Sequence, residues 1–306
     1  MGRTPPVTGN PGSDRKVAII NQLTHTKGPF AGQPFNLRPW QERDIVRPLF
    51  QTTPDGRRQY RTCLLMMPRK NGKSEIAAAF AIDGLIFDGE LGGEVYSCAA
   101  DTEQAAIVFN VAEQMIRNDP ELLAEVEIVH SKLRMIHRAS GTIYRAISAE
   151  AYSKHGFNAS RIIYDELHAA PSRDLFDVLT TSMGARDQPL LIAISTAGYD
   201  RHSILWEMYD HARKVKEHPA LDPTFLPILY EAPADADWTS EAVWHQANPA
   251  LGDFRSLEEM RIACKRAQEI PAQEMTFRRL YLDQWTESAE RWVSLTAWDA
   301  CDVVAA

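Results

Sequence analysis

Cysteine is scarce in this sequence, with four residues among 306, at positions 63, 98, 264 and 301. They are widely separated and include no C-x-x-C pair, which argues against a zinc site and predicts the reduced thiols of a cytosolic protein. Long apolar runs are also missing, since none approaches the ~20 residues that a membrane span needs. The first residues are rich in Gly and Pro and lack the apolar core of a signal peptide. We therefore expect no association with a membrane.

Positive charge is not in excess either, because 33 Lys and Arg residues face 41 Asp and Glu residues. The net charge is −8 and the pI is about 5.6. A monomer that wraps nucleic acid by bulk electrostatics is usually basic. Any contact with DNA must therefore be local, transient or shared among subunits. Six basic residues do gather between positions 57 and 73, where a solvated basic face is the plainest interpretation.

Strand and helix patterns divide the chain into three parts. Residues 1–35, rich in Gly, Pro, Thr and Asn, predict an irregular N-terminal arm. Between residues 36 and 220, apolar strands alternate with helices, which predicts an α/β fold with a mainly parallel sheet flanked by helices. The expected strands are 60–67, 94–100, 133–138, 141–148, 161–165 and 189–198. Residues 221–306 predict a small, mainly helical subdomain.

The first expected strand leads directly into Met-Pro-Arg-Lys-Asn-Gly-Lys-Ser, residues 67–74. The phosphate-loop consensus is G-x-x-x-x-G-K-[ST], so Met67 stands in place of the first glycine. In such a loop Gly72 lets the backbone approach the phosphates, Lys73 reaches the β- and γ-phosphates, and the Ser74 hydroxyl ligates Mg²⁺. Backbone N–H groups and the following helix N-terminus supply the remaining attraction for anionic oxygens. The sequence therefore predicts ATP binding here.

A second motif, Ile-Ile-Tyr-Asp-Glu, ends the strand at 161–165. An apolar strand that ends in two acids can deliver Asp165 to a metal ion and Glu166, as general base, to the attacking water. Solvated acids that merely follow a strand are the alternative interpretation. Because the pair occurs about 90 residues after a phosphate loop, with a strand and a helix between, it favours an ATPase.

Three segments in this order, MPRKNGKSE, YDELHAA and ISTAG, resemble the ATPase domain of a tailed-bacteriophage terminase large subunit. The resemblance extends from about residue 36 to residue 300. It implies a P-loop NTPase fold of the RecA-like class and makes the C-terminal subdomain a lid. It also implies ATP hydrolysis, with Mg²⁺, that drives double-stranded viral DNA into a procapsid.

The resemblance implies partners and a setting as well. The partners are double-stranded DNA, a portal protein, a small terminase subunit and other copies of the chain. We expect a homo-oligomeric ring when the motor is assembled and a monomer when the chain is isolated. The setting would be the cytoplasm of an infected bacterial host.

Further residue roles follow from the resemblance. The family carries an arginine within its phosphate loop, which Arg69 matches as a catalytic residue, and an upstream glutamine that reads adenine, which Gln41 matches. The ATP-binding residues would then be Gln41, Arg69, Lys70, Asn71, Gly72, Lys73 and Ser74. In the family the segment at the end of the 189–198 strand couples hydrolysis to movement, and here it consists of Ser195, Thr196, Ala197 and Gly198. An ordinary turn after a strand is the alternative for that segment.

A cation from a neighbouring subunit often completes the site of a ring motor. The strand at 141–148 would end at the carboxyl edge of the sheet, where ATP also binds, so the loop that follows presents Lys154 as a trans-acting candidate. Arg201, just beyond residues 195–198, is the second candidate by the same geometry. A solvated loop lysine is the alternative for Lys154.

The sequence departs from full terminases at its C-terminus, where they carry a nuclease domain whose clustered acids bind two metals. This sequence stops where that domain would begin, and Asp299 and Asp302 alone do not make a two-metal site. We therefore expect the motor half of such a protein, either as a piece of it or as a natural split product. We expect that this half does not cleave DNA.

Other protein classes fit less well. A helicase-like or other DNA-dependent P-loop ATPase shares the first motifs, but a helicase needs a second RecA-like domain, and too few strands follow residue 198. A nucleotide kinase needs basic residues over an acceptor phosphate and does not need an acid pair at a strand end. A non-enzymatic DNA-docking module does not explain Lys73 and Glu166 together.

Overall fold

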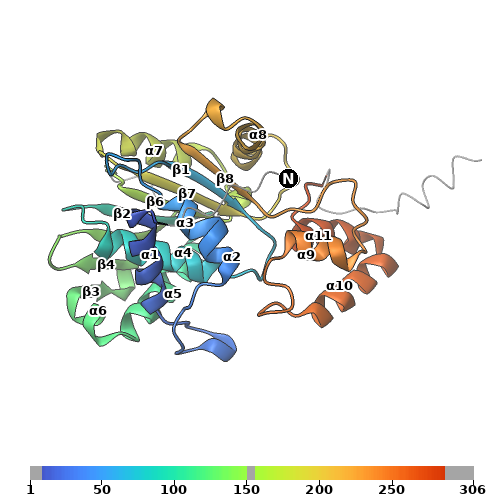
Figure 1. The fold of residues 1–306 in the computed structure, drawn as a ribbon, viewed down its shortest axis with the longest axis horizontal. Coiled ribbons are helices and arrows are strands. Elements are labelled where there is room, and N and C mark those ends of the chain that lie inside the picture. Colours follow the sequence, from blue (N-terminus) through green and yellow to red (C-terminus); the bar gives the residue numbers. More distant parts are fainter. Residues whose placement is uncertain (1–8, 150–155, 287–306) are drawn as a thin grey trace, which may run out of the picture. The chain divides into compact units, whose positions relative to one another are not determined.

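The structure is a computed structural model that describes residues 9–149 and 156–286. An eight-stranded sheet lies at its centre, in the order β3-β4-β5-β2-β6-β7-β1-β8 (Figure 1). The strands are β1 (Thr62–Met66), β2 (Glu94–Ala99), β3 (Val126–Val129), β4 (Arg134–His137), β5 (Ile143–Ser148), β6 (Arg161–Asp165), β7 (Leu190–Ser195) and β8 (Phe225–Leu229). β2 pairs in parallel with β5 and β6, and β6 pairs in parallel with β7, whereas β3–β4 and β4–β5 are antiparallel. The predicted α/β fold with a mainly parallel sheet is confirmed.

Helices flank this sheet. They are α1 (Pro11–Gln22), α2 (Pro39–Gln41), α3 (Arg47–Leu49), α4 (Lys73–Ile82), α5 (Thr102–Arg117), α6 (Pro120–Glu125), α7 (Asp174–Ser182), α8 (Ile204–Glu217), α9 (Glu241–Ala247), α10 (Leu257–Glu269) and α11 (Pro271–Leu282). α4 and α5 pack against each other and against β2, and Figure 1 shows α7 and α8 on the other side of the sheet. Every residue of α4 from Ile76 to Ile82 is buried, as its uniformly apolar sequence predicts.

The N-terminal arm is not irregular between residues 11 and 22, so that prediction is wrong for this stretch. Asn10 caps α1 by accepting a hydrogen bond from the backbone N–H of Ser13 (3.2 Å), and Pro11 occupies the first helical position. Both are standard helix-start signals, which the Gly- and Pro-rich composition of the arm obscured. Val17 and Ile20 of α1 are buried, and burial of this apolar stripe holds the short helix in place.

The chain divides into two compact units. The first comprises Met1–Leu65, Lys73–Ser195 and Met208–Ile228, and it contains nearly all of the sheet. The second comprises Met66–Gly72, Thr196–Glu207 and Leu229–Ala306. Its described core is built from α9, α10 and α11 around Trp244, Met260, Phe277 and Leu282. The C-terminal region is therefore mainly helical up to residue 286, as predicted, and residues 66–72, which precede Lys73 in the phosphate loop, belong to the same compact unit.

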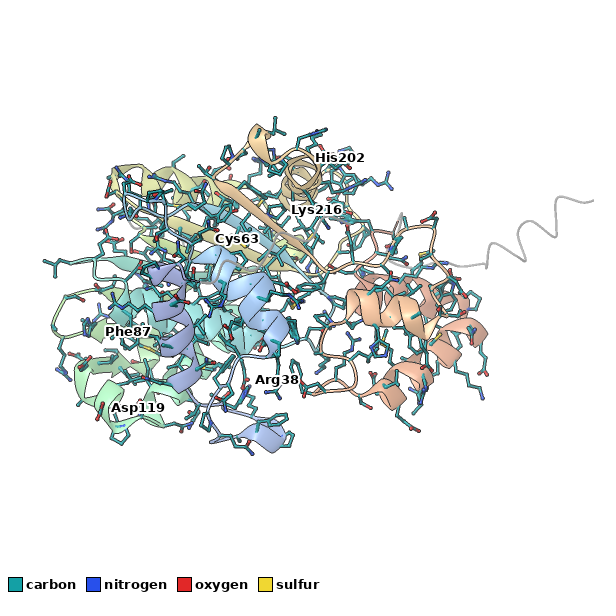
Figure 2. The ribbon with its side chains drawn as sticks, viewed as in Figure 1. Arg38, Cys63, Phe87, Asp119, His202 and Lys216 are labelled. Carbon is teal, nitrogen blue, oxygen red and sulfur yellow. The ribbon has the colours of Figure 1, made fainter. Side chains whose placement is uncertain are left out.

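Cys63, labelled on β1 in Figure 2, is free and buried, as are Cys98 and Cys264. Burial raises the pKa of the Cys63 thiol, which keeps it protonated and unreactive. Cys301 lies outside the described residues. Among the described helices, none is both long enough and apolar enough to cross a membrane.

Candidate nucleotide-binding site

The phosphate loop lies between β1, which ends at Met66, and α4, which begins at Lys73. Met67, the residue in place of the consensus glycine, is only 1% exposed, so its side chain packs in the interior instead of facing a ligand. Gly72 has a φ of 85° and Lys70 a φ of 69°. The left-handed conformation is free of strain for glycine but costs a lysine roughly 1–2 kcal/mol. Strain of this kind concentrates in functional loops.

Asn71, predicted to bind ATP, has a buried side chain that the surrounding structure already uses. Its Nδ2 donates to Oδ1 of Asn248 (2.9 Å), and its Oδ1 accepts from the backbone N–H of Ala250 (3.2 Å). The Arg255 guanidinium also donates to Oδ1 of Asn248. These bonds fix the shape of the loop, so a contact between residue 71 and a phosphate falls to its backbone N–H.

The loop lysine and the two acids come together in the structure. Lys73 is 7% exposed, and its Nζ lies 3.8 Å from Oε1 of Glu166. Asp165 is 5% exposed, and its Oδ1 accepts the backbone N–H of Glu166 (3.1 Å). Burial and the charge of Glu166 raise the pKa of Asp165 to about 7, against the opposing effect of the Lys73 ammonium. A carboxyl group with such a pKa, at the end of a parallel strand, is typical of a functional site.

Oxygen donors at this site suit Mg²⁺, which prefers carboxylate and hydroxyl oxygens and retains several waters. The carboxyl group of Asp165 and the Ser74 hydroxyl would hold the ion. Within residues 9–149 and 156–286, no group of three or more His, Cys, Asp or Glu side chains could hold a metal by itself. The ion would therefore depend on the nucleotide for further oxygens, as is usual for Mg²⁺ at phosphates.

Glu166 makes a contact that the sequence did not predict. Its backbone is left-handed, with a φ of 49°, and its Oε2 lies 3.1 Å from Nδ1 of His168. The same Nδ1 lies 3.1 Å from the Ser195 Oγ at the end of β7. The parallel register between β6 and β7 pairs Asp165 with Ile194, so both motifs leave the sheet at the same edge. The histidine within YDELHAA was the available signal, but nothing in the sequence indicates its partner.

The segment predicted to couple hydrolysis to movement is buried from Ser195 to Ala197. The backbone N–H of Ala197 donates to Oδ1 of Asp283 (2.6 Å), and the Gly198 carbonyl accepts from Thr286 (3.5 Å). The same C-terminal stretch holds the phosphate loop, because the Leu280 carbonyl accepts the backbone N–H of Arg69 (3.0 Å). Residues 280–286 thus contact both motifs within the second unit.

The remaining predicted residues lie in different surroundings. Gln41 ends α2 and is 5% exposed, with its Oε1 accepting the Arg38 backbone N–H (2.9 Å). Its amide nitrogen supplies the donors that adenine recognition would use. Lys70 and Arg69 are exposed, and the Arg201 guanidinium lies over the Trp206 ring at 5.0 Å. Lys154 lies outside the described residues.

Two family models match the chain. One is described as the terminase large subunit ATPase domain and matches residues 39–214, more than half of the sequence. The other, the terminase large subunit endonuclease domain, matches residues 221–305. This second match is at odds with the expectation that the nuclease domain is absent. The described part of its range consists of β8 and helices α9, α10 and α11.

Individual relatives also match the chain. The terminase large subunit of Enterobacteria phage HK97 is 34% identical over 292 residues, covering 94% of this chain and 56% of the relative. Protein YmfN of Escherichia coli K12 is 30% identical over 143 residues, covering 46% of this chain and 31% of that protein. The crystal structure of the HK97 large terminase superposes with a TM-score of 0.80 at 33% identity, over 94% of this chain and 58% of that chain. The chain thus spans little more than half the length of its HK97 relative, and by its match to the ATPase-domain model it belongs to the terminase large subunit family.

Proposed function

We propose that this chain is the ATP-hydrolysing motor portion of a terminase, which drives double-stranded DNA into a procapsid. One observation carries the proposal: the Lys73 ammonium, from the phosphate loop, lies 3.8 Å from the carboxylate of Glu166 at the end of β6. A loop lysine and a strand-end acid converge in this way where a γ-phosphate and its attacking water would lie. The alternative, a helicase-like ATPase unrelated to packaging, has no such support from the relatives.

Each residue of the site has a proposed task in hydrolysis. Lys73, with Arg69 and Lys70, neutralises phosphate charge, while Gly72 and the start of α4 present backbone N–H groups. Ser74 and Asp165 would hold Mg²⁺, which would supply positive charge beside the phosphate oxygens. Glu166 orients the attacking water and accepts its proton.

ATP binding and the activation of Glu166 are linked in this scheme. Without nucleotide, the positive charge of Lys73 faces Glu166 at 3.8 Å. Phosphate oxygens would compete for that ammonium and free the carboxylate for water. The site therefore acquires its base at the moment when substrate is present.

The segment Ser195 to Gly198 is proposed to pass the state of the site to the rest of the chain. Its hydrogen bonds to Asp283 and Thr286 lead into the C-terminal stretch, which also holds Arg69 of the loop. A portal protein, a small terminase subunit and a ring of identical subunits are the proposed partners, in the cytoplasm of an infected bacterium. The division into residues 36–220 and a lid at 221–306 also stays a proposal.

ATP turnover with and without linear duplex DNA tests the proposed function. We expect slow hydrolysis that requires Mg²⁺ and rises when DNA is added. A supercoiled plasmid, incubated in parallel with Mg²⁺ or Mn²⁺, should stay uncut if this chain carries the motor and no nuclease activity. Absence of turnover in the presence of DNA would contradict the motor proposal, and plasmid cleavage would instead favour the endonuclease match over residues 221–305.

Gln41 is proposed to select adenine, because an amide side chain can donate to and accept from the edge of the base. Replacing Gln41 with alanine should lower the preference for ATP over GTP, with an expected loss of roughly tenfold from about 1–1.5 kcal/mol of hydrogen bonding. Competition between the two nucleotides in a turnover assay measures this preference. Gln104→Ala, at an exposed position on α5, is the matched control. An unchanged preference in Gln41→Ala would remove this assignment.

Lys154 stays a proposed trans-acting cation, with Arg201 as the second candidate. Such a residue can contribute ~10³-fold or more to the rate in ring motors and related enzymes. Lys154→Ala and Lys73→Ala subunits should each be inactive, yet a mixed ring places an intact site beside an intact Lys154. Turnover should therefore recover in part on mixing, and specific activity of the wild type should rise with protein concentration. Mixed oligomers that recover no activity would exclude Lys154 from this role.

A further inference from the structure

His168 occupies a position between the two motifs of the site. It lies in the short turn Leu167–Ala169 that follows β6 directly. Its Nδ1 is 3.1 Å from Oε2 of Glu166 and 3.1 Å from Oγ of Ser195, and its backbone N–H donates to the same Oγ (3.2 Å). The histidine therefore contacts the proposed general base on one side and the start of the coupling segment on the other.

Nδ1 of His168 can carry only one hydrogen for the two oxygens beside it. An ionised carboxylate only accepts hydrogen bonds, so a bond to Glu166 requires the proton to be on Nδ1 of His168. One N–H then faces two acceptors, Glu166 and Ser195, at equal distances. In the structure the hydrogen bond of Nδ1 is made with Ser195, and Glu166 lies beside it at ion-pair distance, so the single N–H serves one oxygen at a time.

The carboxylate of Glu166 is held from both sides in this arrangement. Its Oε1 faces the Lys73 ammonium at 3.8 Å, and its Oε2 faces the His168 imidazole at 3.1 Å. Its left-handed backbone, with a φ of 49°, is a strained conformation that persists only when the surroundings enforce it. When phosphate takes over Lys73, the His168 imidazole still lies 3.1 Å from Glu166.

We propose that His168 is a positioning residue whose Nδ1–H sets the orientation of Glu166 and ties it to the position of Ser195. This inference rests on the proposed function, because it assigns Glu166 as the base. A shift of Ser195 would leave the Nδ1–H to Glu166 alone, and a turn of Glu166 toward water would leave it to Ser195. The two acceptors thus give the hydrogen bond two positions, which couples the base to the segment at residues 195–198.

Three substitutions at one position separate this role from simple packing. The amide nitrogen of asparagine lies near the place of Nδ1, whereas that of glutamine lies near the place of Nε2. His168→Ala should lower kcat by roughly 10- to 100-fold, the usual cost of a misplaced catalytic group, with nucleotide affinity within about threefold of wild type. His168→Asn should recover most of kcat, and His168→Gln should not. Equal recovery by both amides, or an alanine variant within twofold of wild type, would overturn the proposal.

The double variant His168→Ala with Ser195→Ala tests the tie between the two residues. If both act through one hydrogen bond, the second change should add less than twofold to the loss from the first, because effects of residues in one network are not additive. Fully multiplicative losses would show that they act separately. Affinity for a fluorescent ATP analogue, measured in each variant, confirms that the site still folds.

A measurement that needs no turnover keeps this inference distinct from the proposed function. Imidazole ¹⁵N NMR of the whole chain, assigned with His168→Gln, should show the Nδ1–H tautomer of His168 at alkaline pH. The Nδ1 resonance should move in both Ser195→Ala and Glu166→Gln. An Nε2–H tautomer with a bare Nδ1 would overturn the inference even if the chain hydrolyses ATP. Wild type without turnover, but with the expected resonances, would instead count against the proposed function alone.

Discussion

Glu166→Gln is expected to bind ATP as tightly as wild type and to hydrolyse it about 10²–10⁴-fold more slowly, the usual range for loss of a general base. Glutamine has the shape of glutamate and keeps an oxygen and a nitrogen near its two carboxylate oxygens, but it cannot accept the proton of water. Lys73→Ala should instead lose ATP binding itself. That change removes the buried ammonium, which is 7% exposed and faces the phosphate position from the start of α4. Equilibrium binding and single-turnover hydrolysis, measured on the same preparations, separate the two defects.

Matched controls for this pair lie at exposed positions outside the site. Glu103→Gln, in the first turn of α5, and Lys214→Ala, near the end of α8, remove the same charges from the surface. Both should bind and hydrolyse ATP as wild type does. If Lys73→Ala and Glu166→Gln lost nucleotide affinity equally, the division of roles between phosphate binding and water activation would be wrong.

Asp165→Asn is expected to stabilise the metal-free protein at pH 8 by up to about 4 kcal/mol, the equivalent of a pKa raised from 3.8 to about 7. The native state binds a proton at Asp165 more tightly than the unfolded state does, so its contribution to stability is present below pH 3.8. That contribution declines as the pH rises and is lost above pH 7. Asparagine cannot ionise, so the stability of the variant should lack this decline. Its advantage should grow between about pH 4 and pH 7 and then level off.

Chemical unfolding in EDTA, followed across this pH range, measures the effect of Asp165→Asn. Asp235→Asn, at an exposed position, is the control and should show no such divergence from wild type. The same substitution should weaken the stabilisation that Mg²⁺ and ATP together give to wild type, because it removes a charged oxygen ligand. A variant less stable than wild type at pH 8 in EDTA would show that the buried carboxylate is favourable in the native state, contrary to this account.

The parts of the site that are contiguous in the chain could be predicted from the sequence. An apolar strand, a Gly-Lys-Ser turn and an Ala-rich helix are adjacent in the chain, so β1, the loop and α4 followed from local pattern. The acid pair at Asp165 and Glu166 followed in the same way from an apolar strand with an abrupt polar end. Parallel strands are expected to end at a shared edge of the sheet, but the register of β6 beside β7, which puts Ser195 near these acids, comes from the structure.

Pairings between distant side chains could not be predicted. Asn71 is predicted to bind ATP, yet its amide is buried against Asn248, and no local pattern links the two. Asp283 lies in the predicted helical subdomain, and nothing in the sequence indicates that its carboxylate accepts the backbone N–H of Ala197. The sequence contains His168 but does not indicate that it contacts both Glu166 and Ser195. Such contacts depend on the tertiary packing of segments far apart in sequence, which single-sequence patterns do not encode.

The central claim is that residues 67–74 and the acid pair Asp165 and Glu166, at the end of β6, form one ATP site. A crystal structure of Glu166→Gln with ATP and Mg²⁺ tests it most directly, since the slow variant should retain intact nucleotide. The account predicts the β- and γ-phosphates against residues 69–74, the metal between Ser74 and Asp165, and a water beside residue 166. A nucleotide bound elsewhere, such as in the cavity of about 420 Å³ lined by Lys16 and Arg58, would contradict it.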